Sequence, residues 1–267
     1  MSASTRAPLR ALAVLPARLG STRLPRKVLL EETGTPLFVH SARNVARCQD
    51  IERVVVATDS EEVQAVGNDY GVEVRMTSAA HPSGTDRVNE VSQELAGDYD
   101  VIINVQADEP EVAAGDLSRL VRAFESGEVE VATLCVPIEN PAELDSPSVV
   151  KLVRDGSGDA LFFSRAPIPS SSHARNGETH RATGLRHLGV YAFRPSALGE
   201  FCKMSVSPLE AAESLEQLRW LESGRRIRVL DASHAPRGID TQADYDEFVE
   251  RTMKNGNAEQ RRPQHSE

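Results

Sequence analysis

Four cationic side chains gather in a short segment near the start of the chain. The segment reads LPARLGSTRLPRK over residues 15–27 and carries Arg18, Arg23, Arg26 and Lys27, with Ser21 among them. Arginine binds a phosphate through two parallel hydrogen bonds, and lysine acts as a mobile point charge. The composition therefore suits a triphosphate site, although the segment matches neither a P-loop nor a GxGxxG motif. A solvated basic loop explains the same residues, and both interpretations stay open.

Carboxylates follow two apolar runs elsewhere in the chain. In NVQADEP, Asp108 and Glu109 come directly after a run of β-branched residues. Mg²⁺ prefers one or two carboxylates together with phosphate oxygens and water, so this position favours a metal site over a carboxylate that caps the next helix. In RGIDT, Asp240 is a second candidate ligand. Its spacing alone favours an ordinary role as the N-cap of the closing helix.

Two further segments carry polar residues whose roles the spacing leaves open. HPSGTDR forms a turn into a helix, and its Ser83, Gly84 and Thr85 can read the edge of a base or simply cap the helix. His187 in LRHLGVY lies in the middle of an expected strand. A lone histidine in a strand more often has a structural role than a functional one.

The segment LEAAESLEQLR predicts an amphipathic helix with several acidic residues. On one continuous helix Glu210, Glu213 and Gln217 are spaced i, i+3 and i+7 and therefore share a face. That face is distinct from the apolar one, which contains Leu215 and Leu218. Acidic residues on a helix are mostly solvated, so the pattern alone does not assign them to a site.

Alternating strands and helices position these residues in the first half of the chain. Continuous β-branched runs such as RVVVAT and VIINV are typical of parallel strands that are buried on both faces. Their alternation with amphipathic stretches up to Val136 predicts an α/β fold with a doubly wound, mostly parallel sheet. Beyond Val136, strands without regular helices between them predict an inserted β-rich region. The expected strands are 12–15, 53–58, 72–76, 101–105, 129–136, 149–153, 160–163, 186–193 and 226–230. Two helices are expected to start near residues 36 and 60, and four more to span 85–95, 117–124, 208–221 and 241–253. A loop is expected at 167–184.

The composition is that of one globular domain. The chain has 267 residues, 40% of them hydrophobic, and no apolar run approaches the length of a membrane span. Residues 1–9 and 254–267 lack apolar periodicity and are expected to be flexible tails. The length leaves room for one large domain or two small ones, and because the sequence shows no internal repeat and no linker, residues 10–253 are expected to form a single domain.

Charge and cysteine content exclude further classes of protein. The net charge of −10 and the pI near 5.3 argue against a general nucleic-acid binder, although local arginines can still attract a small anion. Cys48, Cys135 and Cys202 show no metal-binding spacing, which is typical of reduced thiols in the cytoplasm. The apolar stretch after Arg10 is cut short by Pro16, so no secretory signal is expected. We therefore expect a cytoplasmic protein with neither nucleic-acid nor membrane partners.

Nine segments together resemble those of the 3-deoxy-manno-octulosonate cytidylyltransferases, or CMP-Kdo synthetases. They are PARLGSTRLPRK, VVATDSEEV, MTSAAHPSGTDR, NVQADEP, ATLCVP, FFSRAPIP, LRHLGVY, SPLEAAESLEQLR and GIDT. The resemblance follows the order and spacing of the family over residues 12–249, nearly the whole chain. Relatives with the same fold share mainly the first segment and the acidic turn, so the full set is specific.

The resemblance implies a nucleotidyltransferase fold in which the inserted β-rich region serves the dimerisation of a homodimer. It implies that CTP and 3-deoxy-manno-octulosonate (Kdo) give CMP-Kdo and pyrophosphate for lipopolysaccharide biosynthesis, with Mg²⁺ as cofactor. The implied catalytic residues are Lys27, Asp108 and Asp240, the last two as metal ligands. The implied nucleotide-binding residues are Arg18, Ser21, Arg23, Lys27, Ser83, Gly84, Thr85 and Gln106. The implied sugar-binding residues are Arg165, His187, Tyr191, Glu210, Glu213 and Gln217.

Two departures from the family pattern concern the site. Ala107 stands where members usually have glycine, and a positive φ there would cost about 1 kcal/mol. Ala211 and Ala212 are smaller than the residues often found at these positions, which predicts a roomier sugar pocket. An enzyme for an amino variant of Kdo would match the same motifs. A sialic acid cytidylyltransferase would match them less well, and a non-catalytic nucleotide-binding protein would be expected to lack the catalytic residues.

Overall fold

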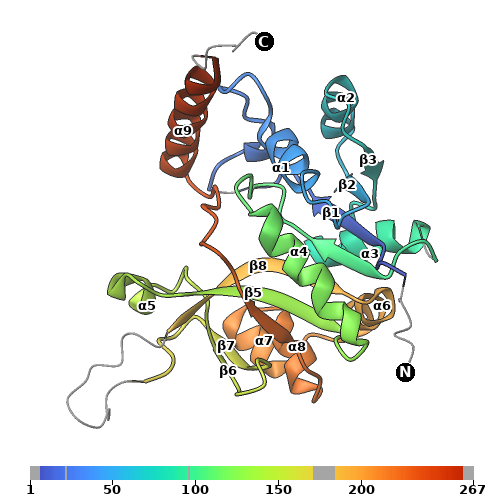
Figure 1. Ribbon diagram of the computed structural model, residues 1–267, viewed down its shortest axis with the longest axis vertical. Coiled ribbons are helices and arrows are strands. Elements are labelled where there is room, and N and C mark those ends of the chain that lie inside the picture. The colour runs from blue at the N-terminus through green and yellow to red at the C-terminus, as the bar shows by residue number, and fades with distance from the viewer. Residues whose placement is uncertain (1–6, 22, 96, 171–183, 261–267) are drawn as a thin grey trace, which may run out of the picture.

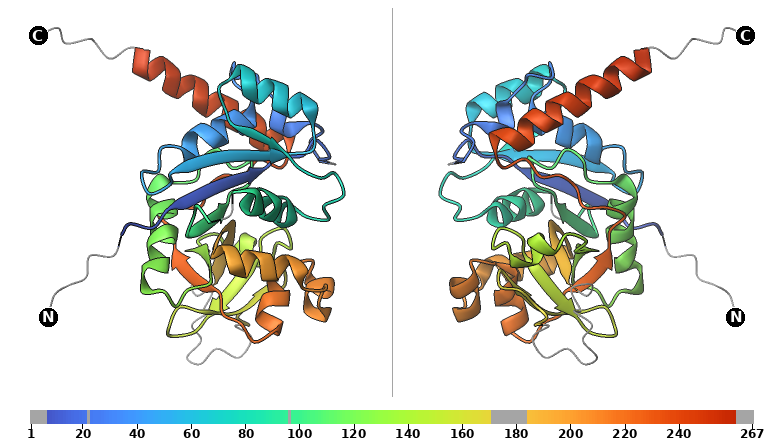
Figure 2. Two further views of the ribbon diagram at one scale, coloured as in Figure 1. Left: turned by 90° about the vertical axis from the view of Figure 1, so that its right-hand side faces the viewer. Right: turned by 90° about the vertical axis from the view of Figure 1, so that its left-hand side faces the viewer.

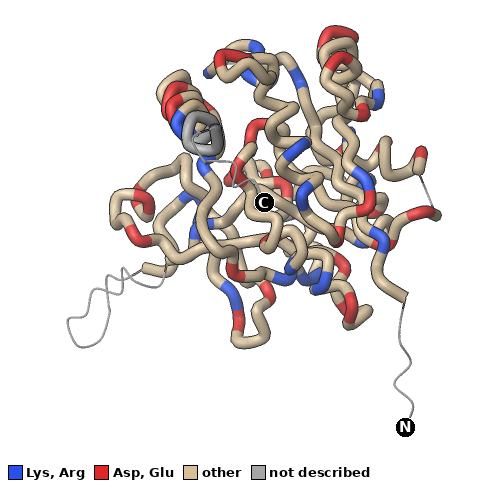
Figure 3. Tube along the Cα trace, turned by 45° about the horizontal axis from the view of Figure 1, so that its top comes forward, with Lys and Arg blue, Asp and Glu red and all other residues tan. Residues whose placement is uncertain are grey.

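The structure, a computed structural model, describes residues 7–21, 23–95, 97–170 and 184–260, with the backbone alone for residues 255–260. Most of the predicted loop 167–184 and parts of both predicted tails lie outside the described residues. Within the described chain no helix has the length and apolarity needed to cross a bilayer. Basic and acidic positions are interspersed along the trace (Figure 3).

A nine-stranded sheet runs through the described chain (Figure 1). Its order is β3–β2–β1–β4–β8–β5–β9, with β6 and β7 attached beside β8. β1 (Ala11–Pro16) pairs in parallel with β2 (Arg53–Thr58) and with β4 (Val101–Asn104), and β2 pairs in parallel with β3 (Val74–Met76). Valine and isoleucine dominate β2 and β4, and β1 is apolar throughout, because both faces of a central parallel strand are buried. The strands predicted for the first half of the chain are confirmed.

β8 (Leu185–Phe193) runs against the direction of its neighbours. It is antiparallel to β4 and to β5 (Val131–Pro137), while β5 pairs in parallel with β9 (Arg228–Asp231). β6 (Lys151–Arg154) and β7 (Ala160–Ser164) form an antiparallel hairpin, and β6 also pairs with β8. The sheet is therefore mostly parallel along its described path, and the predicted β-rich region consists of this hairpin and β8.

Helices cover both faces of the sheet. Alternation along β1 sends Ala11, Ala13 and Leu15 into one apolar cluster and Leu12 and Val14 into another. Each cluster is completed by helices, which is the doubly wound arrangement that the sequence predicts. The helices are α1 (Leu37–Val45), α2 (Glu61–Asp69) and α4 (Ala114–Arg122) in the first cluster, and α3 (Gly84–Glu94), α6 (Pro195–Lys203) and α8 (Gln217–Glu222) in the second.

The closing helix α9 (Gln242–Gln260) returns to the first half of the molecule, as Figure 2 shows in red. Its Tyr245 and Phe248 pack against Leu24 and Ile239 in a small separate cluster. This packing brings the segment before α9 beside the loop that follows β1.

The structure corrects the predicted C-terminal tail. A tail was expected over residues 254–267, but α9 continues through residue 260. No proline interrupts residues 242–260, although the NGN run at 255–257 consists of weak helix formers, so helix propensity does not explain the continuation. Residues 261–267 lie outside the described chain.

A single helix predicted over residues 208–221 is two helices. α7 (Pro208–Glu213) ends at Ser214, whose φ of 53° is left-handed, and α8 follows at a new angle. A left-handed residue cannot continue a right-handed helix. Two further helices, α5 (Pro141–Asp145) and α6, lie outside the predicted set, although both start with a proline in the first turn.

Candidate functional site

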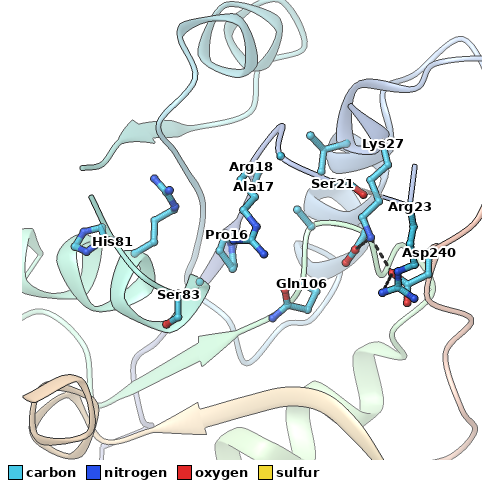
Figure 4. A pocket seen from close by; sticks show the side chains of 16 residues that line it. Pro16, Ala17, Arg18, Ser21, Arg23, Lys27, His81, Ser83, Gln106 and Asp240 are labelled. Atoms are coloured by element: carbon cyan, nitrogen blue, oxygen red, sulfur yellow. Dashed lines mark hydrogen bonds and ion pairs between the residues drawn. The ribbon is translucent and has the colours of Figure 1, made fainter. Parts of the chain in front are cut away.

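A cavity of about 250 Å³ lies where β1 and β4 end. Because these strands are adjacent and parallel, the loops that follow them meet at the same edge of the sheet. Figure 4 shows the side chains from these loops together with those from the start of α3 and the segment before α9. The predicted site residues that line this cavity are Arg18, Ser21, Arg23, Lys27, Ser83, Gly84, Gln106, Asp108 and Asp240.

Lys27 lies between the two predicted metal ligands. Its Nζ forms an ion pair with Asp108 and a second one with Asp240 at 3.0 Å, and it donates a hydrogen bond to the carbonyl of Ile239. Burial alone would lower the pKa of Lys27, but the facing carboxylates of Asp108 and Asp240 raise it above its ordinary value. The charged ammonium therefore holds the two carboxylates close to one another.

Asp240 is available for this contact because its neighbour caps α9. Thr241 Oγ1 accepts a hydrogen bond from the N–H of Asp244 at 3.2 Å, and the Asp244 carboxylate accepts one from the N–H of Thr241 at 2.8 Å. This reciprocal pair is a capping box. The interpretation of Asp240 as the cap, which its spacing favoured, is therefore wrong. The Asp240 carboxylate contacts Lys27 and, at 3.1 Å, Arg23 (Figure 4).

Asp108 and Asp240 form a donor set that suits Mg²⁺. They already converge on a cation, the Lys27 ammonium. The described residues contain no cluster of three or more acidic, histidine or cysteine side chains that could hold a metal without other ligands. Two carboxylates are what Mg²⁺ uses when phosphate oxygens and water fill its other positions. The site therefore fits an ion that arrives with a polyphosphate.

The start of α3 closes the cavity on the side away from Lys27. Ser83 caps this helix, and Gly84 lies so close to β1 that a Cβ would come within 3.3 Å of Pro16. Arg87, to which the sequence assigned no role, also lines the cavity, and its buried guanidinium contacts Asp59 at 3.1 Å. That contact ties α3 to the end of β2. No local signal distinguishes Arg87 from a surface arginine, because its burial depends on the packing of three elements.

Ala107 introduces no backbone strain. Among the described residues, the non-glycine positions with positive φ are Arg26 and Ser214, so the predicted cost at Ala107 does not arise. The Ala107 carbonyl accepts a hydrogen bond from Ser41 of α1 at 2.8 Å, which fixes the acidic turn against this helix. Arg26 directly precedes Lys27 and has a φ of 56°, so the strained backbone lies in the cationic loop instead.

A second cavity of about 370 Å³ adjoins the first and shares Gly84 and Gln106 with it. Among the described residues its lining includes no lysine or arginine, and Glu216 is its charged side chain. A pocket with apolar walls and a few fixed polar groups suits an uncharged, hydroxylated part of a ligand. The remaining polar side chains of the lining are Thr85, Asn104, His187, Tyr191, Ser214 and Gln217.

Thr85 was predicted on the nucleotide side, but its side chain lies in the second cavity. Its hydroxyl donates a hydrogen bond to Glu216 at 2.9 Å. The sequence analysis assigned no role to Glu216, because it expected one continuous helix over residues 208–221 and therefore no change of direction at this residue. The break at Ser214 brings residues 214–217 to the cavity wall.

A bulge in β8 aims His187 and Tyr191 into the second cavity. The register with β5 shifts between Thr133 and Leu134, and the Thr133 hydroxyl lies 3.0 Å from His187 Nε2. Gly189 lies between the two side chains and leaves the space open. Burial lowers the pKa of His187 to about 3, so its imidazole is neutral at physiological pH.

Three predicted sugar-binding residues do not line either cavity. Glu210 is buried in an ion pair with Arg219. The Glu213 carboxylate accepts hydrogen bonds from the Ser164 hydroxyl at 2.6 Å and from the N–H of Arg165 at 2.8 Å. The Arg165 guanidinium donates to the carbonyl of Glu213 at 2.9 Å. The shared helix face predicted for Glu210, Glu213 and Gln217 is wrong, because Ser214 breaks the helix between them.

Comparisons with known proteins agree with this geometry. A family model described as cytidylyltransferase matches residues 12–227. The chain is 44% identical over 237 residues to the 3-deoxy-manno-octulosonate cytidylyltransferase of Anaeromyxobacter sp. (strain Fw109-5), which covers 89% of this chain and 94% of that protein. It is 42% identical over 247 residues to the enzyme of the same name from Polynucleobacter necessarius subsp. necessarius (strain STIR1), covering 91% and 96%. A solved structure of CMP:2-keto-3-deoxy-manno-octonic acid synthetase complexed with CTP matches with a TM-score of 0.85 and 37% identity, covering 92% of this chain and 99% of that chain.

Proposed function

Because the chain belongs to the 3-deoxy-manno-octulosonate cytidylyltransferase family, we propose that it transfers CMP from CTP to the anomeric hydroxyl of Kdo. The products are pyrophosphate and CMP-Kdo, the activated sugar for lipopolysaccharide biosynthesis. The observation that carries this proposal is the pair of adjoining cavities, one rich in cations and carboxylates and the other without cations, which share Gln106. A polyanionic nucleotide suits the first environment, and the hydroxylated part of a sugar acid suits the second.

The cationic cavity receives CTP. Arg18, Arg23 and Lys27 bind the phosphates, because they come from one loop and line one cavity. Ser83 lies across the cavity from Lys27 (Figure 4), so the start of α3 and Gln106 face the cytidine. Gly84, next to Ser83, allows the start of α3 to lie close to β1, since a larger residue at this position would contact Pro16.

Asp108 and Asp240 hold Mg²⁺ in this proposal. The bound ion supplies positive charge at the α-phosphate and lowers the pKa of the attacking hydroxyl. Lys27 occupies the space between the two carboxylates when phosphates are absent. The nucleotide phosphates offer the Lys27 ammonium a new partner, which releases both carboxylates for the ion.

The sugar acid spans the junction of the two cavities. Its carboxylate and anomeric hydroxyl are close together in the molecule, and they lie toward the cations of the first cavity, because the second offers no lysine or arginine. The remaining hydroxyls lie in the second cavity, within reach of Tyr191 and Gln217. His187 takes part as a neutral imidazole.

The reaction is a direct displacement at phosphorus. The anomeric oxygen forms a bond to the α-phosphorus, the bond from this phosphorus to the bridging oxygen breaks, and pyrophosphate leaves. The hydroxyl proton passes to solvent, and no covalent enzyme intermediate forms. Positioning and charge neutralisation provide the catalysis, with Lys27 and Arg23 stabilising the departing pyrophosphate.

The proposal extends to a homodimer that acts in the cytoplasm. Leu161 on β7 is 60% exposed, and it lies in the hairpin region to which the family resemblance gives a role in dimerisation. Light scattering on the purified chain tests the oligomeric state. A monomeric mass at all protein concentrations contradicts the dimer without affecting the proposed reaction.

Purified protein incubated with Mg²⁺, CTP and Kdo tests the reaction. Pyrophosphate release is measured for each combination of four nucleoside triphosphates with Kdo, its amino variant and sialic acid, and the product is identified by mass. We expect the highest kcat/KM for CTP with Kdo. Asp108→Asn should abolish turnover and keep the unfolding profile, while Asp69→Asn at the exposed end of α2 serves as the matched control. A protein that turns over no sugar acid with CTP would refute the proposal.

A further inference from the structure

Three residues that line the second cavity each carry a buried polar atom without a partner. These atoms are Oδ1 of Asn104 on β4, the hydroxyl of Tyr191 on β8 and Nε2 of Gln217 on α8, and each is buried with no hydrogen-bond partner among the described residues. Asn104 is 2% exposed and Gln217 is 6% exposed. A buried polar atom that stays unpaired is costly, so native proteins rarely leave one unsatisfied. Three such atoms around one cavity indicate a polar ligand that completes their hydrogen bonds.

The sheet holds Asn104 in a fixed position. It is the last residue of β4, next to Val14 of β1 and directly opposite Tyr191 of β8. The pairing on both sides fixes its backbone, and the surrounding packing, which leaves the residue 2% exposed, restricts its side chain. The Asn104 amide is therefore held in the wall of the cavity before any ligand binds.

Two other polar groups of this cavity have partners within the protein. Glu216 Oε2 accepts the hydrogen bond from Thr85, and His187 Nε2 lies within hydrogen-bond distance of the Thr133 hydroxyl. Asn104 Oδ1 has neither kind of partner. A ligand hydroxyl can therefore complete the hydrogen bonding of Asn104 Oδ1, in addition to meeting other acceptors of the cavity such as the second carboxylate oxygen of Glu216.

We propose that Asn104 is a specificity-determining residue that accepts a hydrogen bond from one non-anomeric hydroxyl of the sugar acid. This inference rests on the proposed function, because it takes the second cavity as the place of the sugar acid. Tyr191 and Gln217 bind neighbouring oxygens of the same molecule, so the three side chains together read the arrangement of its hydroxyl groups. An analogue that lacks the hydroxyl facing Asn104 leaves Oδ1 buried and unpaired in the complex, and such sites discriminate strongly.

The test compares Kdo with analogues that each lack one non-anomeric hydroxyl. For wild-type protein we expect the analogue that lacks the hydroxyl facing Asn104 to lose about ten- to a hundredfold in kcat/KM. In Asn104→Ala the ratio of kcat/KM for Kdo to kcat/KM for this analogue falls toward one. The corresponding ratios for the other analogues, and the KM for CTP, stay within a few-fold of the wild-type values. Asn104→Leu, which is closer in volume, repeats the measurement if the alanine variant does not fold. Asn104→Asp retains an acceptor oxygen and should retain the discrimination.

Asn44→Ala is the matched control. Asn44 is half-buried on α1, it lines neither cavity, and its side-chain amide donates a hydrogen bond to the Val112 carbonyl. All ratios should be unchanged in this variant. Ratios that stay at the wild-type values in Asn104→Ala and Asn104→Leu overturn the inference and leave the proposed function intact. If wild-type protein prefers another sugar acid to Kdo, the proposed substrate fails, and the same comparison is made with analogues of that acid. A wild-type protein that accepts no sugar acid overturns both.

Discussion

Replacing Lys27 by methionine should make the metal-free protein less stable and more responsive to Mg²⁺. Methionine keeps most of the length of the side chain but removes its charge. The two carboxylates that Lys27 contacts, those of Asp108 and Asp240, then face each other without a cation between them. The same change frees both carboxylates for a metal ion before any nucleotide binds.

The geometry sets the size of the effect. A contact of 3.0 Å between Lys27 Nζ and Asp240 corresponds to about 5 kcal/mol of Coulomb attraction at an effective dielectric constant of about 20. Desolvation of the lysine offsets part of this, and the Asp240 side chain is 49% exposed, so that solvent screens the pair. We therefore expect a loss of about 2–4 kcal/mol in the free energy of unfolding, slightly below the range for fully buried pairs.

Urea denaturation with and without Mg²⁺ measures both effects, and calorimetry gives the affinity of the nucleotide-free protein for the ion. Mg²⁺ at a hundredfold excess over its dissociation constant adds about 2.7 kcal/mol to the stability, so the variant should regain most of its loss. Lys254→Met is the control, because its pair with Glu250 is exposed on α9. A Lys27→Met protein that is as stable as wild type, and gains no more than wild type from Mg²⁺, refutes this account of the carboxylates.

Four further expectations concern the second cavity and the helices α7 and α8 beside it. Burial lowers the pKa of His187 from 6.5 to about 3, so the folded protein binds fewer protons than the unfolded chain between these values. The stability that neutral His187 contributes is therefore complete above pH 6.5 and declines as the pH falls toward 3. When the free energy of unfolding is measured by denaturation at a series of pH values, His187→Gln should reduce its dependence on pH in this range. Glu210→Ala should lower the free energy of unfolding by about 3–5 kcal/mol, because it leaves the Arg219 side chain, which is only 12% exposed, without its carboxylate partner. Gln217→Ala should chiefly raise the KM for the sugar in steady-state kinetics. Ser214→Gly should raise stability by about 1 kcal/mol in the same denaturation assay, since glycine adopts a φ of 53° without strain; an unchanged midpoint would contradict the assignment of strain to this residue.

The parts of the site that follow from strand order could be predicted from the sequence. Short apolar runs mark β1 and β4 as buried strands, and residues that directly follow parallel strands of this kind collect at one edge of the sheet. The cationic loop with Lys27 and the acidic turn with Asp108 therefore had to meet if the two strands were neighbours. The register that aligns Leu12 with Ile102 fulfils this condition.

The remaining features depend on long-range packing that no local pattern signals. Ser214 breaks the predicted helix in a segment without glycine or proline, so neither the ion pair of Glu210 nor the position of Glu216 in the cavity wall could be read from spacing. Asp240 and Thr241 are both good cap residues. In the structure Thr241 caps α9, while Asp240 binds Lys27, which is distant in the chain. The buried amide of Asn104 looks, in sequence, like any polar residue at a strand end.

The division of the two cavities along the chain has a consequence for how such enzymes can diversify. Residues up to 108, together with Asp240, line the first cavity, whereas the second is built mainly from residues 131–227. Gly84 and Gln106 belong to both. A chimera that keeps residues up to 108 and exchanges residues 131–227 changes most of the second cavity while its choice of nucleotide is inherited unchanged, but it also keeps Asn104 and Thr85 in that cavity. The hydrogen bond from Thr85 to Glu216 joins the two parts, so such a chimera must keep a compatible pair at these positions.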